Sequence, residues 1–225
     1  MTTLLSYQNP EKIMVQEVDC LFYHDKSSEE KIPMKKKGDK WILEKNLPSG
    51  EHRYVFLING NLRLNDPEAN MYAPDENQKI WSVILINEEG QRLYNNKEYR
   101  LHIDHYQLSS FLSEQEMVTV KKTFNKRMDP KVAARFTFSD VTGLHCVTVA
   151  WYKPDGTLDR FAEQYLVEPE MANEKIKLWF WINLKESKKQ IPVGKWILKL
   201  FIDGRYILED SFMINEQSIY GPFHQ

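Results

Sequence analysis

The chain has 225 residues, 42% of them hydrophobic and 28% charged, and its 30 Lys and Arg residues nearly balance 32 Asp and Glu residues. This length corresponds to one large domain or two small ones, and the near-neutral charge gives no electrostatic reason to expect nucleic acid or a membrane as partner. No stretch approaches the ~20 consecutive apolar residues that span a bilayer, and the amino terminus lacks a signal-peptide pattern, so a cytoplasmic location is the default expectation.

The first half contains short runs of β-branched and aromatic residues separated by Pro, Gly, Asn and Asp, a pattern that predicts strands. The strands are expected at 14–22, 41–44, 52–58 and 80–86. Asn59-Gly60 predicts a tight hairpin, because a type I′ turn needs positive φ at both central residues. The polar segment 27–38, which includes Lys35-Lys36-Lys37, is predicted to be a solvated loop.

The second half has the same character. Its strands are expected at 118–124, 132–138, 144–151, 161–167, 176–182, 195–202 and 206–214. Pro154-Asp155-Gly156 and Asp203-Gly204 supply the residue types that tight turns need. The segment from Ser109 to Glu116 is predicted to be a short linker, which divides the chain into domains at 1–108 and 109–225.

An internal repeat supports this two-domain organisation. Leu47-Pro48-Ser49-Gly50 corresponds to Ile191-Pro192-Val193-Gly194, at an offset of 192 − 48 = 144 positions, and the same offset pairs 56–60 with 200–204. In each copy, Gly leads into a central strand and an Asn-Gly or Asp-Gly turn returns the chain as the neighbouring strand. The sequence therefore predicts an all-β protein of two tandem immunoglobulin-like β-sandwiches, each of about 100 residues.

The segment from Gly38 to Ile86 resembles the family 48 carbohydrate-binding modules, which include the glycogen-binding domain of AMP-activated protein kinase β subunits. The resemblance is carried by Trp41 with Leu43, by the run from Leu47 to Phe56, by Asn59-Gly60 and by Asp66-Pro67. It implies the early-set immunoglobulin-like fold for the first domain, because these positions belong mostly to the family's scaffold. The second domain resembles generic immunoglobulin-like domains.

The resemblance also implies where a glycan would bind, and this chain departs from the family there. The family's Trp after the first strands has no counterpart near 24–28. Val55 replaces a Lys, Leu62 replaces a Trp, and Trp81 or Ser82 stands near the family's Asn. A glycan needs exposed aromatic faces for its C–H surface and polar groups for its hydroxyls, so a carbohydrate polymer is expected to bind through other residues.

Trp179-Phe180-Trp181 is the most unusual local feature. On a strand, Trp179 and Trp181 share one face about 6–7 Å apart and could stack on a sugar or a peptide. Together with Trp81, they are the candidate ligand-binding residues. The alternative is that these indoles pack inside a sandwich or between the domains, because Trp is highly buried on average.

His102-Ile103-Asp104-His105 is the only dense cluster of metal-capable side chains. On a regular strand His105 lies on the opposite face from His102 and Asp104, so the three cannot converge on a metal without a bend. Cys20 and Cys146 are too few for a disulfide scaffold and are expected to pack as small hydrophobes. No phosphate-loop, nucleophile-elbow or metalloprotease motif occurs, so no catalytic residue, metal or cofactor is predicted.

These observations favour a non-catalytic binding protein. The first hypothesis is recognition of a carbohydrate polymer through Trp81, Trp179 or Trp181. The second is a protein-interaction or assembly module that binds another protein through a sheet edge or an apolar patch. The third and least favoured is an enzyme or metal protein that uses His102, Asp104 and His105.

Overall fold

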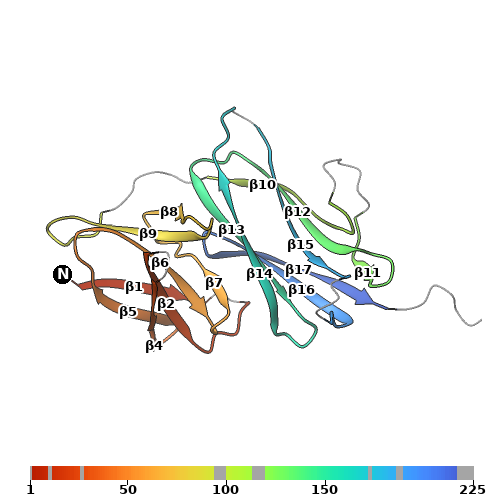
Figure 1. The fold of residues 1–225 in the computed structure, drawn as a ribbon, viewed down its shortest axis with the longest axis horizontal. Coiled ribbons are helices and arrows are strands. Elements are labelled where there is room, and N and C mark those ends of the chain that lie inside the picture. Colours follow the sequence, from red (N-terminus) through yellow and green to blue (C-terminus); the bar gives the residue numbers. More distant parts are fainter. Residues whose placement is uncertain are drawn as a thin grey trace, which may run out of the picture.

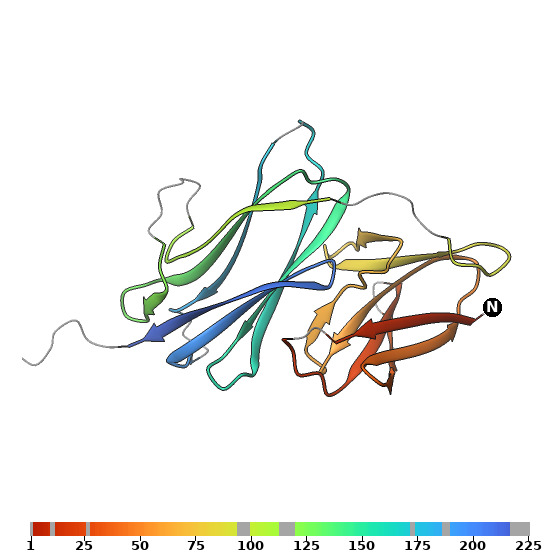
Figure 2. The same ribbon diagram turned by 180° about the vertical axis from the view of Figure 1, so that it is seen from behind.

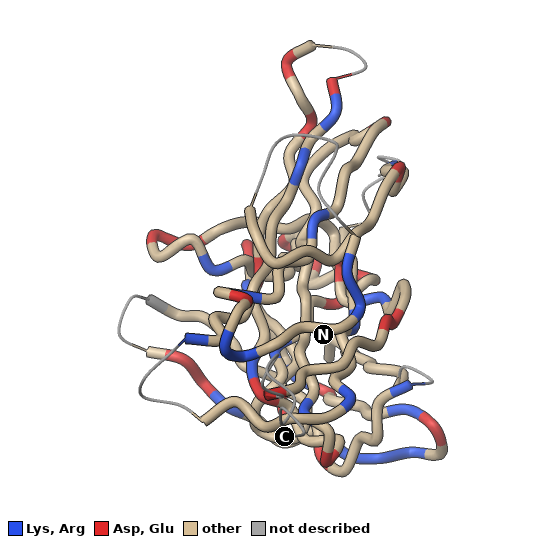
Figure 3. Tube along the Cα trace, turned by 90° about the vertical axis from the view of Figure 1, so that its right-hand side faces the viewer, with Lys and Arg blue, Asp and Glu red and all other residues tan. Residues whose placement is uncertain are grey.

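The structure is a computed structural model that describes residues 2–9, 12–25, 28–93, 100–112, 120–171, 174–185 and 190–216. All regular secondary structure within these ranges is β-strand, which confirms the predicted all-β class. The same ranges contain no helix that could cross a membrane. Basic and acidic residues are interspersed over the molecule (Figure 3).

The first half of the chain forms a β-sandwich, drawn red to yellow in Figure 1. Apolar side chains alternate along its strands, so each sheet buries one face: Tyr54, Phe56 and Ile58 of one sheet share a core with Leu5 and Tyr7 of the other. The smaller sheet has the order β1 (Thr2–Gln8), β5 (Lys40–Asn46) and β4 (Lys35–Lys37). The larger sheet has the order β3 (Ser28–Pro33), β2 (Val18–Asp25), β6 (Gly50–Ile58), β9 (Ile80–Ile86) and β8 (Met71–Pro74), with β7 (Leu62–Leu64) paired to β6.

The second half forms another sandwich, drawn green to blue in Figure 1 and seen from behind in Figure 2. Its core contains Phe136 and Phe180 of one sheet and Val149, Trp151 and Trp196 of the other, all buried. The smaller sheet has the order β10 (His102–Ser109), β12 (Lys131–Ser139) and β15 (Ile176–Asn183). The larger sheet has the order β11 (Thr123–Asn125), β17 (Arg205–Asn215), β16 (Gly194–Ile202), β13 (Leu144–Tyr152) and β14 (Leu158–Val167).

The sequence repeat corresponds to equivalent strands of the two sandwiches. β6 and β16 begin and end at positions 144 residues apart, and each pairs with the first strand of a preceding hairpin, β2–β3 or β13–β14. The glycines that open them, Gly50 and Gly194, have φ values of 123° and 130°, and Asn59-Gly60 and Asp203-Gly204 all have positive φ. The two hairpins therefore occupy the same place in their sheets.

The segment 27–38 is not the solvated loop that its polarity predicts, because the described part of it forms β3 and β4. The side chains of Lys35, Lys36 and Lys37 are all exposed on β4, which lies at the edge of its sheet. Charged residues are common on such edges, and a strand that buries neither face leaves no alternation in the sequence. The sequence pattern did not predict β1. The strand expected at 118–124 corresponds in the structure to the short strand β11, and residues 118–119 lie outside the described part of the chain.

The predicted linker from Ser109 begins at the last residue of β10; its residues 113–116 lie outside the described part of the chain. β10 pairs with β12 over its length, from His102 opposite Ser139 to Ser109 opposite Ala133. β10 is thus a strand of the second sandwich. We therefore propose that the division between the domains lies between β9 and β10 instead of after Leu108.

The two sandwiches are in direct contact. β13 and β14 use their outer faces to pack against β7, β8 and β9 of the first sandwich. Ala150 and Phe201, from the outer face of the larger second sheet, are buried in the core cluster of the first half. Each half keeps its own core, but the contact between them is apolar and closely packed.

Candidate ligand-binding face

The outer face of the sheet β10–β12–β15 carries two accessible tryptophans. Leu178, Phe180 and Ile182 of β15 point into the core, so Trp179 and Trp181 point outward, on one shared face as the strand pattern predicts. Trp181 exposes 43% of its surface and Trp179 is half-buried. The other four tryptophans are buried: Trp41, Trp81, Trp151 and Trp196.

Strand register arranges this face in rows that run across the three strands. Each row contains one residue from β15, one from β12 and one from β10: Trp181–Ala133–Ser109, Trp179–Arg135–Gln107 and Lys177–Thr137–His105. The β12 residues of these rows, and Gln107 and Ser109 of β10, are at most 7% exposed, whereas Lys177 and His105 are exposed. An aromatic strip along β15 therefore ends beside two accessible polar side chains. Tryptophan surrounded by hydrogen-bonding groups is the combination that a sugar requires, because its ring has apolar C–H faces and polar edges.

Two cations hold the indoles in place. The Arg135 guanidinium lies 5.4 Å from the ring centroid of Trp179, and Lys131 Nζ lies 5.5 Å from that of Trp181. Both distances are within the range of a cation–π attraction. Gln164 Nε2 of β14 also donates a hydrogen bond of 2.6 Å to the Trp179 carbonyl, which ties this part of β15 to the neighbouring sheet. The aromatic strip is therefore ordered before any ligand arrives.

A pocket of about 490 Å³ lies at the end of the strip beyond Trp179. It is lined by Asp104, His105, Arg135, Thr137, Lys175 and Lys177. A β-bulge between Ile103 and His105 inserts one residue into β10 and brings Asp104 and His105 to this same pocket. The expectation that His105 lies on the opposite face from Asp104 is therefore wrong, because the bulge interrupts the alternation of the strand.

The histidine and aspartate cluster does not form a metal site in the described residues, where no group of three His, Cys, Asp or Glu side chains could hold an ion. The Asp104 carboxylate accepts hydrogen bonds from Lys175 Nζ at 2.8 Å and Ser139 Oγ at 2.7 Å, and these lower its pKa. His102 is exposed, with Nε2 3.8 Å from Asp104, and His105 Nε2 is 3.0 Å from Gln107 Oε1. The carboxylate already has cationic and hydroxyl partners.

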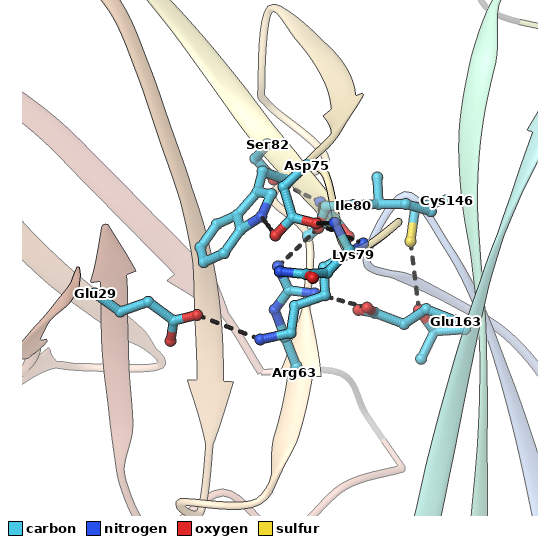
Figure 4. Close-up of polar contacts among 12 residues, drawn as sticks. Glu29, Arg63, Asp75, Lys79, Ile80, Ser82, Cys146 and Glu163 are labelled. Carbon is cyan, nitrogen blue, oxygen red and sulfur yellow. Dashed lines mark hydrogen bonds and ion pairs between the residues drawn. The ribbon is translucent and has the colours of Figure 1, made fainter. Parts of the chain in front are cut away.

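Trp81 does not lie on a surface, contrary to its place among the candidate binding residues. It is completely buried on β9, where its indole N–H donates to Asp75 at 3.0 Å. The Arg63 guanidinium lies 4.3 Å from its ring centroid and donates to Glu163 of the second sandwich at 2.7 Å (Figure 4). Trp81 thus belongs to the contact between the sandwiches, which the pattern of one strand does not reveal.

Two further family glycan positions, those of Val55 and Leu62, are also buried. Val55 is completely buried, and Leu62 exposes 2% of its surface in the core that Ala150 and Phe201 complete from the second half. Three of the positions at which this sequence departs from the family are therefore closed to a ligand.

Both cysteines are free and buried. Burial raises the pKa of both the Cys20 and the Cys146 thiol well above the ordinary value, which disfavours the reactive thiolate. His145 Nδ1 is 2.7 Å from Asp203 Oδ2 and Nε2 is 3.1 Å from the Thr142 carbonyl oxygen. The two thiols pack as small apolar groups, as expected.

The fold is a pair of all-β sandwiches, and the first of them can be compared with a known family. Residues 25–92 match the family described as the glycogen recognition site of AMP-activated protein kinase. No curated protein matches the chain. Among solved structures, the chain is similar to an immunoglobulin-like protein from Pseudomonas aeruginosa, with 18% identity and a TM-score of 0.39, over 52% of this chain and 97% of that one. Most of the first sandwich is therefore similar to a family described by its recognition of glycogen.

Proposed function

We propose that this protein is a non-catalytic carbohydrate-binding protein, and that its binding surface is the outer face of β10–β12–β15. The family match of the first sandwich supports a polysaccharide as partner. The observation that carries the proposal is the accessible pair Trp179 and Trp181, aligned on one strand beside polar side chains. Stacking of sugar rings on these indoles provides binding without any reacting group.

Replacing Trp181 with Ala is expected to weaken oligosaccharide binding about 10- to 30-fold, the loss of about 1.4–2 kcal/mol that truncation of an aromatic anchor causes. Folding should be preserved, because this side chain lies outside the core. The measurement is titration calorimetry with a panel of neutral and acidic oligosaccharides, alongside intrinsic fluorescence, which responds to ligand through Trp179 and Trp181 because the other four indoles are buried.

The matched control is Tyr165→Ala, which removes another aromatic side chain, 45% exposed, from β14 in the other sheet. This variant should bind as the parent does. Equal binding by Trp181→Ala and the parent, or no binding of any sugar by the parent, would contradict the proposal.

A protein-interaction module is the second candidate, favoured by one feature. Within the described residues, β14 lies at the edge of its sheet and exposes Tyr165 and Val167, which are 45% and 44% accessible. An accessible strand edge with apolar side chains can pair with another chain. If this function holds, light scattering should show a particle size that increases with protein concentration. The increase should be smaller in Tyr165→Ala, and sugars should not change it.

A further inference from the structure

We propose that the ligand of this face is an acidic glycan, a sugar chain that carries carboxylate or sulfate groups. The inference rests on the proposed carbohydrate-binding function and specifies its ligand class. It joins two features that lie side by side: the aromatic strip of Trp179 and Trp181, and the pocket at its end.

The pocket has a positive charge although the chain as a whole does not. Among the residues that the structure describes, its lining contains Arg135, Lys175 and Lys177 and one carboxylate, Asp104, so with His105 neutral the formal charge of these residues is 3 − 1 = +2. The whole chain has a formal charge of −2. Lys131, above the Trp181 ring, adds another cation to the same face. Positive charge is therefore concentrated locally beside the indoles.

The side chains along β15 place a cation next to two aromatic stacking surfaces, and an acidic oligosaccharide carries an anionic group next to its stacking ring faces. Lys177, Trp179 and Trp181 follow one another at every second residue of the strand, so they form a line about 13 Å long. Sugar rings can stack on the two indoles while an anionic substituent on an adjacent ring lies in the pocket. A neutral glycan would gain the stacking contacts alone.

Arg135 and Thr137 provide the polar floor of this arrangement. Both lie on the central strand β12 and line the pocket, where they are 2% and 7% exposed. A guanidinium presents donors in the planar geometry that fits a carboxylate or sulfate, and partial exclusion of water strengthens such a contact. Asp104 is held by Lys175 and Ser139, so repulsion of an anion by its carboxylate is partly offset.

The test compares the full chain with three probes of similar length: an oligogalacturonate, a sulfated oligosaccharide and a maltooligosaccharide. Titration calorimetry at low and high salt is expected to show at least about tenfold tighter binding of an acidic probe than of the neutral one, a difference that salt reduces. The two acidic probes distinguish a carboxylate from a sulfate as the preferred group.

Lys177→Gln is expected to weaken binding of the preferred acidic probe about 3- to 10-fold and to lower the ratio of acidic to neutral affinity, because the exposed ammonium contributes a partly screened attraction. Lys175→Gln serves as a second variant at the same pocket. Lys195→Gln, an exposed lysine on β16 in the other sheet, is the control and should bind as the parent does.

The outcomes separate this inference from the proposed function. Equal binding of acidic and neutral probes, insensitive to salt and to Lys177→Gln but lost in Trp181→Ala, would overturn the acidic ligand and keep carbohydrate binding. Absence of binding to all three probes would overturn both. A third outcome is that the acidic probes bind Trp181→Ala as they bind the parent but bind Lys195→Gln more weakly. This result would show nonspecific attraction to lysines and would also overturn the inference.

Discussion

Replacing Gly204 with Ala is expected to lower the free energy of unfolding by about 2–5 kcal/mol. Gly204 lies in the turn of the second repeated hairpin at φ +80°, and a Cβ built there would overlap the backbone carbonyl oxygen of Asn65 in the first sandwich. Left-handed backbone costs an L-residue about 1–2 kcal/mol, and forced overpacking typically costs a further 1–3 kcal/mol. Urea denaturation measures the change.

Gly60→Ala provides an unusually close control, because Gly60 is the equivalent position of the first hairpin. Its φ is +69°, and the nearest atom to an added Cβ is the end of the Glu17 side chain at 3.4 Å. Only the backbone cost of about 1–2 kcal/mol is expected here. Equal destabilisation by the two substitutions would contradict the close contact of the sandwiches at Gly204.

Arg63→Met is expected to destabilise the protein by about 3–5 kcal/mol at neutral pH, because breaking a buried ion pair leaves an uncompensated charge. The side chains of Arg63 and Glu163 are 9% and 10% exposed, with a separation of 2.7 Å. Arg63 also donates to the Ile80 carbonyl and lies over Trp81. Thermal and urea denaturation test this expectation, with Arg53→Met on the exposed side of β6 as the control.

The stability of Arg63→Met should also depend on pH. Desolvation by burial raises the pKa of Glu163, and Arg63 opposes this rise in the parent. Without Arg63, the carboxyl group binds a proton more tightly in the folded than in the unfolded state. The deficit relative to the parent should therefore be smallest below the unfolded pKa, about 4.3, and grow as the pH rises through the folded pKa.

The double variant Arg63→Met, Glu163→Leu removes both charges and distinguishes a broken pair from lost packing. It is expected to recover most of the stability at neutral pH and to lose the pH dependence of the deficit, because no buried carboxyl remains. A double variant as unstable as Arg63→Met would show that the ion pair is not the cause.

Much of the fold could be predicted because its strands bury one or both faces. The strands around 52–58, 80–86, 132–138, 144–151 and 176–182 all leave apolar patterns, and the repeated Gly and Asn-Gly or Asp-Gly turns require positive φ. The polar edge strands β3 and β4 were missed because an exposed strand leaves no such pattern. The proposed boundary between β9 and β10 rests on the pairing of β10 with β12, which no local pattern in the sequence reveals.

The binding face, too, could be predicted only in part from local sequence patterns. The shared orientation of Trp179 and Trp181 follows from strand alternation, but the neighbouring cations come from β12, more than 40 positions earlier in the chain. Register between the strands places Arg135 beside Trp179, and a bulge turns His105 into the pocket with Asp104. A search for polar residues on adjacent predicted strands would have found Arg135 only if the register had been known.

By itself, the sequence determined the all-β class, the two related hairpins and the common face of Trp179 and Trp181, because turn chemistry and alternation act between residues close along the chain. Only the tertiary structure decided that Trp81 is buried beneath Arg63 and that Arg135 and Asp104 line one pocket with Lys175 and Lys177 beside Trp179. Burial and charge at a position depend on which strands and which sandwich lie opposite it, and those neighbours are distant in sequence.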